Sequence, residues 1–314
     1  MTFGRTGLRV ATVLACAAAL QGCSAARGAT CTAVPGTVVW KTGAGNLGQY
    51  DLPSVNDGQC SVDRSRPDYV VPVITGSDVS FRLLRNTANT YTYEGNRYRG
   101  SSTCYRNQMN PRDPNTGTNS MLNPGSRYTF TFQTVVTLHG NTLNEGLGPG
   151  RGIAVDLPGI VWQTHSYGEG PTNGNGPCDM LLISNTQADR WTGRYPDSPP
   201  GGKPIWSFKS CSDSDNAVGR RYFSPDTLHD GELDTWQIDI AAQLDGRSGG
   251  SVVVRRNGRV VYDAAAGVCD SHAYHGCWWN FGPYMYYWEN SNEPPGWNDA
   301  GITVQFKDMT LYKL

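Results

Sequence analysis

The sequence has little charge and no surplus of either sign. Asp, Glu, Lys and Arg make up 17% of the 314 residues, and the formal net charge is −1. Such a chain has no global field that would attract nucleic acid or a membrane surface, so neither is expected as a direct partner. Beyond the first 22 residues, no stretch approaches the roughly 18 consecutive apolar residues of a membrane-spanning helix.

Metal-ligand spacings and helical periodicity are also scarce. No Cys-x-x-Cys or His-x-x-x-His pair supports a zinc site. Loop Asp and Asn residues leave a structural calcium ion open, but no ordered ligand motif indicates one. No cofactor is required by the chemistry inferred below.

The first residues are typical of a secretory signal. Arg5 and Arg9 precede an apolar stretch that ends in Leu20-Gln-Gly-Cys23. A basic start, a short apolar core and small residues at the cleavage point are the marks of such a signal. The tetrapeptide resembles the lipobox of bacterial lipoproteins, with Cys23 as the acylated residue. The alternative is ordinary cleavage after Ala26.

We therefore expect a signal peptide over residues 1–22, a tether over 23–30 and a single domain over 31–314. The protein would be exported as an outer-membrane or cell-surface lipoprotein, or otherwise be secreted or periplasmic. Its contact with a membrane would be through the lipid anchor alone. We expect a monomer.

Export into an oxidising compartment favours disulfide bonds. The chain has 9 cysteines, and Cys16 would leave with the signal while Cys23 would carry the lipid. Spacing alone suggests three pairs and leaves Cys104 single. The suggested pairs are Cys269 with Cys277, Cys178 with Cys211, and Cys31 with Cys60.

The remaining composition is that of a loop-rich β-protein, with 38 Gly, 19 Pro, 9 Trp and 16 Tyr. Short runs of alternating apolar and polar residues recur between turn residues, and Asn257-Gly258 is the strongest hairpin signal. Many short strands of this kind predict an all-β sandwich of jelly-roll type. The expected strands include Ser80–Leu84, Arg127–Val136, Met180–Ile183, Thr235–Ile240, Ser251–Arg255, Arg259–Tyr262, Gly301–Phe306 and Met309–Lys313.

One of these strands carries a polar pair. In the run Gly159–Ser166, Gln163 and His165 are two residues apart and therefore share a face, while Trp162 and Thr164 take the other. An amide beside an imidazole can hold an anionic group and move a proton. The alternative is a Gln and a His on the wet surface of a sheet.

A second segment, Cys277–Trp288, is dense in aromatic rings. Trp278, Asn280 and Gly282 share one face if the strand is regular, and Pro283 would place it at an edge or break it. Aromatic rings at this density form either a core or a floor on which sugars stack.

The two segments together resemble those of jelly-roll polysaccharide lyases, the group that holds alginate lyases, glucuronan lyases and heparin lyase I. Trp162-Gln-Thr-His165 resembles the Gln-x-His motif of the group. Trp279–Tyr284 resembles its Tyr-Phe-Lys-Ala-Gly-x-Tyr strand, matching at an aromatic residue, at Gly282 and at Tyr284. The order of the motifs also fits, over residues 70–314, and the layout is closer to the heparin-lyase-I-like group than to alginate lyases.

The resemblance implies a concanavalin A-like jelly roll and β-elimination in a uronic-acid-containing polysaccharide. A base removes the C5 proton, the C4–O bond breaks, and an unsaturated uronate remains. Catalysis would fall to His165 as the base, Gln163 facing the carboxylate, and Tyr284 protonating the leaving oxygen or serving as both base and acid for one epimer.

Substrate contacts are implied for Arg99, Arg106, Asn280, Trp278 and Tyr286. The arginine strand of the group has no clean copy around Arg99 and Arg106, and its lysine is Asn280 here. Both departures remove positive charge from the expected carboxylate site, so they leave the identity of the acidic polysaccharide and the level of activity open.

Two other functions stay open at this point. A non-catalytic carbohydrate-binding surface lipoprotein would need the same aromatic residues but no proton transfer. A glycoside hydrolase on the same fold would need two carboxylates that flank the scissile bond. Glu232-Leu-Asp234 is the nearest sequence to such a motif.

Overall fold

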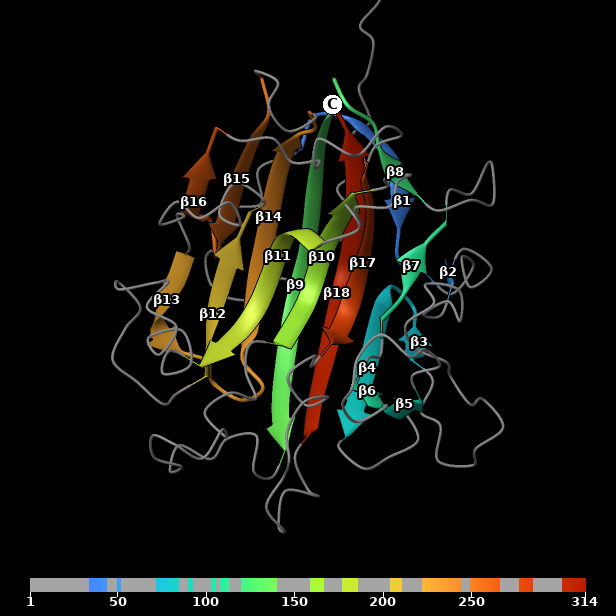
Figure 1. The fold of residues 1–314 in the computed structure, drawn as a ribbon, viewed down its shortest axis with the longest axis vertical. Helices are drawn as coiled ribbons and strands as arrows, with labels where there is room; N and C mark the ends of the chain where they lie inside the picture. Colours follow the sequence, from blue (N-terminus) through green and yellow to red (C-terminus); the bar gives the residue numbers. More distant parts are fainter. Residues whose placement is uncertain are drawn as a thin grey trace, which may run out of the picture.

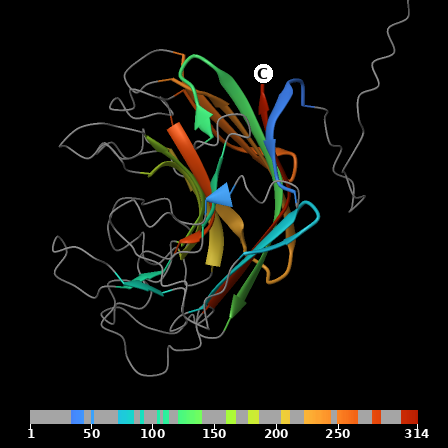
Figure 2. The same ribbon diagram turned by 90° about the vertical axis from the view of Figure 1, so that its right-hand side faces the viewer.

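The computed structural model consists of two β-sheets packed face to face, one of eight strands and one of six (Figures 1 and 2). All the strand pairs that the structure describes are antiparallel. This arrangement is a jelly-roll sandwich, which confirms the predicted fold class. The structure describes residues 34–43, 50–51, 72–84, 90–92, 103–105, 108–112, 120–139, 159–166, 177–185, 204–210, 222–243, 249–265, 277–284 and 301–314.

The eight-stranded sheet runs in the order β16-β15-β14-β9-β18-β4-β3, and β1 also pairs with β18. Its strands are β1 (Thr37–Lys41), β3 (Val73–Thr75), β4 (Asp78–Leu84), β9 (Arg127–His139), β14 (Leu233–Ala241), β15 (Ser251–Arg256), β16 (Arg259–Ala264) and β18 (Gly301–Lys313).

The six-stranded sheet runs in the order β13-β12-β11-β10-β17-β8, and two short ribbons pair β2 with β7 and β5 with β6. The six strands are β8 (Met121–Leu122), β10 (Gly159–Ser166), β11 (Pro177–Asn185), β12 (Pro204–Lys209), β13 (Tyr222–Thr227) and β17 (Cys277–Tyr284). The ribbons are β2 (Tyr50–Asp51), β5 (Thr90–Thr92), β6 (Thr103–Tyr105) and β7 (Asn110–Pro111).

The strands expected from alternation are present, with one difference at the C-terminal end. Asn257 and Gly258 have positive φ angles of 52° and 79°, the geometry of the predicted tight hairpin between β15 and β16. Gly301–Phe306 and Met309–Lys313, expected as two strands, form the single strand β18. A bulge separates its halves, because Asp308 adopts a φ of 48° and the pairing with β9 shifts between Lys307 and Thr310.

Aromatic rings fill the space between the sheets. Phe130 of β9 meets Trp162 of β10 and Trp279 of β17 edge-on, with ring centroids 5.1 and 4.9 Å apart. Trp40 of β1 packs against Trp279 in the same way at 5.0 Å. All four rings are buried. Each such pair adds about 0.5–1.5 kcal/mol to the gain from burial itself, so the rings fix which face of β10 and β17 is turned inward.

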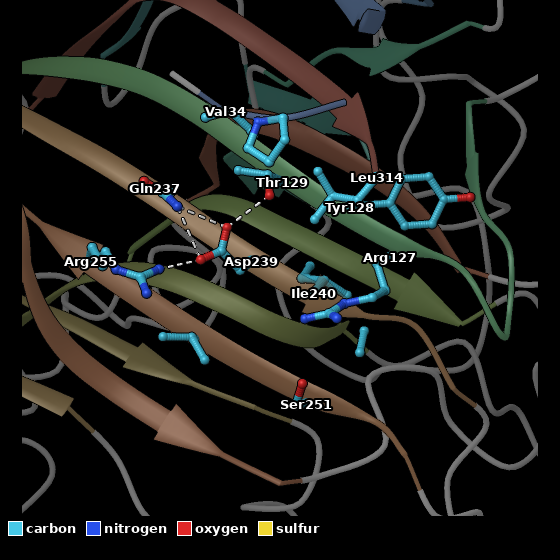
Figure 3. Close-up of a pocket in the computed structure, with 13 residues that line it drawn as sticks. Val34, Arg127, Tyr128, Thr129, Gln237, Asp239, Ile240, Ser251, Arg255 and Leu314 are labelled. Carbon is cyan, nitrogen blue, oxygen red and sulfur yellow. Dashed lines mark hydrogen bonds and ion pairs between the residues drawn. The ribbon is translucent and has the colours of Figure 1, made fainter. Parts of the chain in front are cut away.

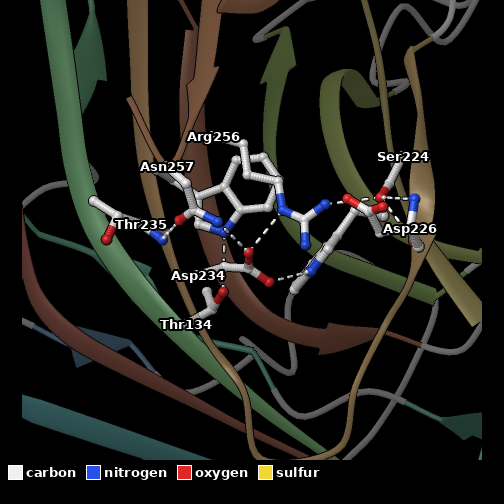
Figure 4. Close-up of polar contacts among 9 residues, drawn as sticks. Thr134, Ser224, Asp226, Asp234, Thr235, Arg256 and Asn257 are labelled. Atoms are coloured by element: carbon white, nitrogen blue, oxygen red, sulfur yellow. Dashed lines mark hydrogen bonds and ion pairs between the residues drawn. The ribbon is translucent and has the colours of Figure 1, made fainter. Parts of the chain in front are cut away.

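A buried ion pair within the eight-stranded sheet is hydrogen-bonded to the other sheet (Figure 4). Asp234 of β14 accepts hydrogen bonds from Trp206 Nε1 of β12 at 2.6 Å and from Arg256 Nε of β15 at 2.7 Å. We call Asp234, Trp206 and Arg256 the inter-sheet clamp. Burial alone would lower the pKa of Arg256, but the hydrogen bond and charge of Asp234, aided by Tyr222, raise it above its usual value. The guanidinium is therefore charged at every working pH.

Replacing one partner of the clamp is expected to destabilise the fold strongly. Asp234→Asn leaves the largely buried charge of Arg256 without a counterion, which costs about 3–5 kcal/mol. Denaturant unfolding would measure the loss. The control Asp263→Asn, at an exposed position of β16, should change stability by less than about 0.5 kcal/mol. Equal effects of the two substitutions would contradict a stabilising clamp.

His139, at the end of β9, contacts the neighbouring strand β18 through its imidazole ring. Its Nε2 lies 2.8 Å from Thr303 Oγ1 of β18. Burial, followed by the positive charge of Arg82, lowers the pKa of His139 below its ordinary value of 6.5, and Asp230 offsets this only in part.

The depressed pKa predicts a pH dependence of stability. Below pH 6.5, the unfolded chain binds a proton at this histidine that the folded protein resists, so stability present above pH 6.5 is lost as the pH falls through the folded pKa. His139→Gln should flatten this part of a curve of unfolding free energy against pH. An unaltered slope in His139→Gln would refute the assignment.

Candidate active site

Alternation along β10 and β17 brings two amide side chains together. Trp162 and Trp279 enter the core, so their neighbours Gln163 and Asn280 occupy the other face of the six-stranded sheet. Gln163 pairs directly with Asn280 across the two strands. The face they share, turned away from the eight-stranded sheet, is the inside of the bend of this sheet in Figure 2.

A third amide, Gln108, completes the group. Its Nε2 donates to the carbonyl oxygen of Gly282 at 3.1 Å, and its Oε1 accepts a long hydrogen bond of 3.4 Å from Gln163 Nε2. We call Gln108, Gln163 and Asn280 the amide group. Their exposed fractions are 1%, 0% and 2%, so the polar atoms of the group are removed from bulk solvent.

These hydrogen bonds fix how the two glutamine amides are turned. The Gly282 carbonyl can only accept, so Gln108 must present its nitrogen there and its oxygen to Gln163. Gln163 then directs its nitrogen to Gln108 and its oxygen elsewhere. The Oε1 of Gln163 and the Oδ1 of Asn280 are buried without a hydrogen-bond partner among the described residues. Buried polar atoms are normally paired, and an unpaired one costs about 1–3 kcal/mol.

The predicted catalytic residues lie along the same two strands. The backbone of His165 belongs to β10 and pairs with Trp278, but its side chain is outside the described part. Tyr284 pairs with Ile160 and is half-buried against Ile160, Met180 and Leu182.

Trp278 and Tyr284 are six positions apart on β17, which corresponds to about 20 Å in a straight strand. The sheet is bent, and its concave face is turned away from the eight-stranded sheet (Figure 2). A ligand that touches both ends must therefore be extended along the strand.

Some of the predicted substrate contacts can be placed and others cannot. Trp278 is half-buried beside β8, and Asn280 is in the amide group. Arg99, Arg106 and Tyr286 lie outside the described residues. The aromatic residues of β17 are distributed between its two faces, as strand alternation requires. Trp279 and Phe281 are core residues, whereas Trp278 is on the opposite face.

Cys277 is buried and disulfide-bonded. The structure does not describe the side chain of its partner, so its pairing with Cys269 stays a prediction. The backbones of Cys104 and Cys178 are in β6 and β11, but nothing is described of their side chains. The remaining disulfide candidates Cys31, Cys60 and Cys211 and the lipid site Cys23 also lie outside the described part.

Gln108 was not found from the sequence. It occurs in a polar loop segment without strand alternation, and nothing in its spacing relates it to Gly282, 174 positions later. Its place is set by Met109, which exchanges two backbone hydrogen bonds with Phe281 of β17 at 2.8 and 3.2 Å. Only the folded chain reveals this contact.

The carboxylates considered for a hydrolase do not form a site. Asp234 is bound by Trp206 and Arg256 in the inter-sheet clamp, and Glu232 is exposed. Within the described ranges, no group of three or more His, Cys, Asp or Glu side chains could hold a metal ion. No helix in that part of the chain is long and apolar enough to cross a membrane.

Comparisons with known proteins give similarity in structure alone. No protein-family model matches the chain, and no curated protein matches its sequence. An endo-β-1,4-glucuronan lyase from the fungus Trichoderma reesei is 12% identical, covers 84% of this chain and 94% of its own, and has a TM-score of 0.45.

Two alginate lyases give similar values. One from Pseudomonas aeruginosa is 15% identical over 85% of this chain and 99% of its own, with a TM-score of 0.49. A marine family 7 enzyme from Zobellia galactanivorans is 12% identical over 85% of this chain and 96% of its own, also with a TM-score of 0.49. These proteins are from the group that the sequence motifs resemble.

Stability measurements can test the unpaired oxygen of Asn280. Asn280→Leu should leave the free energy of unfolding unchanged or raise it, because it removes a buried acceptor that has no partner. Gln108→Leu should lower it by about 1–3 kcal/mol, because the Gly282 carbonyl loses its donor. Thermal or denaturant unfolding of both variants gives the comparison. A loss in Asn280→Leu as large as in Gln108→Leu would show that the oxygen is bonded.

Proposed function

We propose that this protein is a polysaccharide lyase that cleaves a uronic-acid-containing polysaccharide by β-elimination. The observation that carries the proposal is the amide group on the face of β10 and β17 away from the core, with two buried oxygens that have no partner among the described residues. Polar atoms held buried at a cost to stability are explained if a ligand completes their hydrogen bonds. The motif resemblance supplies the reaction class.

The reaction needs the carboxylate charge to be offset. Removal of the C5 proton moves negative charge onto the carboxylate, so donors aimed at this group stabilise the transition state. A primary amide has two N–H donors and an acceptor oxygen. Gln163 uses one N–H on Gln108, which leaves one donor for the uronate carboxylate and an oxygen for a sugar hydroxyl.

Asn280 offers a similar amide but no positive charge. We assign the missing charge to Arg106 or Arg99, and we expect elimination to be slower than it would be with a lysine at position 280. Trp278 and Tyr286 are proposed to stack on neighbouring sugar rings. No cofactor enters these steps.

Proton transfer is assigned to His165 and Tyr284. An imidazole with a pKa near neutrality suits removal of the C5 proton. The phenol of Tyr284 would protonate the oxygen that leaves C4, or serve as both base and acid for one epimer. His165 and Tyr284 are near opposite ends of the paired segment, so this assignment requires their side chains to converge on the C4–C5 bond of one uronate.

The proposed location follows from the N-terminal segment. Cleavage before an acylated Cys23 would anchor the enzyme at the outer membrane or cell surface, where extracellular polymers are accessible. Without acylation the mature chain would be periplasmic or secreted. In either case we propose a monomeric enzyme that acts on an acidic polysaccharide outside the cytoplasm.

A substrate panel tests the reaction directly. Purified protein given alginate, glucuronan, heparin and related polyuronates between pH 5 and 9 should release products with new ultraviolet absorbance, since elimination creates a conjugated double bond. His165→Ala and Tyr284→Phe should each lower the rate by about 10²–10⁴-fold, the usual contribution of a general acid or base. His229→Ala and Tyr312→Phe are matched controls elsewhere on the fold and should retain full activity.

The outcome also separates the alternatives. New reducing ends without ultraviolet absorbance would indicate a hydrolase. Retention of a glycan without any cleavage, unchanged in His165→Ala, would indicate a non-catalytic binding protein. Full activity in both His165→Ala and Tyr284→Phe would refute the assignment of these two residues.

A further inference from the structure

The outer face of the eight-stranded sheet contains a groove of about 350 Å³. It lies over β9, β14 and β15 and is closed on one side by Val34, Pro35 and Leu314 (Figure 3). Its size is at the lower end of the range for small-molecule sites, about 300–1,000 Å³. The amide group is on the outer face of the other sheet, so the two places are separated by the thickness of the sandwich.

The floor of the groove is a fixed polar network. Asp239 of β14 accepts hydrogen bonds from Thr129 Oγ1 at 2.8 Å and from Gln237 Nε2 at 3.0 Å, and it forms an ion pair with Arg255 of β15. The carboxylate is therefore occupied by donors from three side chains. Arg255 has five N–H donors, of which this ion pair uses only part.

Arg127, at the start of β9, provides a cation that is not neutralised. It is exposed, and in the part of the chain that the structure describes its guanidinium has no hydrogen bond or ion pair. Figure 3 shows its side chain extending from β9 toward Ile240 of β14. The charged side chains in the lining are Arg127, Arg255 and Asp239. Because Arg255 is paired with Asp239, the guanidinium of Arg127 is the group in the lining that can bind an anionic ligand.

The remaining lining fits a sugar. Ser251 and Gln237 offer a hydroxyl and an amide to ring hydroxyls, and the wall of Val34, Pro35 and Leu314 offers an apolar surface to ring C–H groups. A guanidinium binds a carboxylate through two parallel hydrogen bonds, which a point charge cannot do. An acidic sugar is the ligand that uses all three kinds of surface.

We propose that this groove is a second glycan-binding site, which holds a uronate residue of an acidic polysaccharide on the back of the sandwich. The choice of a uronate rests on the proposed function. A polymer bound in the groove stays attached to the enzyme. Another segment of the same polymer, or a second polymer chain, can then bind to the opposite face, which carries the amide group. Such linkage raises the effective concentration of polymer without new contacts at the catalytic face.

Binding is best measured in a His165→Ala background, in which the polymer is not consumed. Gel retardation in alginate and glucuronan, with dextran as the neutral control, gives apparent Kd values. Arg127→Glu should weaken binding of the acidic polymer about ten-fold, the loss expected for one charge-assisted contact. Ser251→Tyr, which obstructs the groove without a change of charge, should also weaken it. Arg259→Glu, an exposed arginine of β16 outside the groove, should not.

The activity of the otherwise unaltered enzyme provides a second measurement. Arg127→Glu should raise KM for the polymer and leave kcat and the rate on short oligosaccharides unchanged, because the catalytic face is intact. Added salt should reduce the difference between the parent and Arg127→Glu, since exposed charges are screened over about 8 Å at physiological ionic strength.

The two proposals fail in different ways. If binding depends on Arg127 but no polymer yields product, the lyase function is refuted and the glycan-binding groove is supported. If product forms but the parent, Arg127→Glu and Ser251→Tyr bind the acidic polymer equally, the glycan-binding groove is refuted and the lyase function is supported. Equal retardation by dextran, or no retardation by any acidic polymer, would also overturn the second site.

Discussion

The insertion of Trp162 between the sheets is the constraint on which the candidate site depends. A strand has two faces, so an indole fixed against Phe130 forces Gln163 to the opposite side. Trp279 does the same for Asn280 on the neighbouring strand. The register between β10 and β17 then sets the two amides opposite each other. A slip of one residue would place polar amides in the core and two tryptophans on the surface, so the position of the site is specified as firmly as the core.

The alternation that builds the sheets could be read from the sequence, and so could the placement of Gln163 and Trp162 on opposite faces of their strand. The hairpin at Asn257-Gly258 was equally accessible, because it is a local signal. The continuity of β18 was not, since Lys307 and Asp308 interrupt the alternation as a turn would and only the partner strands reveal a bulge. Gln108 escaped prediction for a different reason. Its partner is 174 positions away, and no local pattern encodes such a contact.

The inter-sheet clamp and the amide group are two buried polar networks that differ in how completely their polar atoms are hydrogen-bonded. In the clamp, the carboxylate of Asp234 accepts from three side chains, and Arg256 also donates to Ser224 Oγ at 2.7 Å (Figure 4). In the amide group, two oxygens have no partner among the described residues. A buried polar network that only stabilises the fold needs all its hydrogen bonds to be made within the protein. By this criterion Asp234, in the candidate hydrolase motif Glu232-Leu-Asp234, has a structural role, whereas Gln163 and Asn280 are candidates for binding a ligand.

The bulged strand β18 has a further consequence for how the protein is made. It is in the middle of the eight-stranded sheet, where β9 borders one edge and β4 and β1 share the other. Its pairing joins residues as distant as Thr37 and Lys313, and contacts of such separation form slowly. A ribosome produces this strand after all the others that the structure describes, so the larger sheet lacks its central strand until β18 has been made. Until then, the edges of β4 and β9 that β18 covers have no strand to pair with.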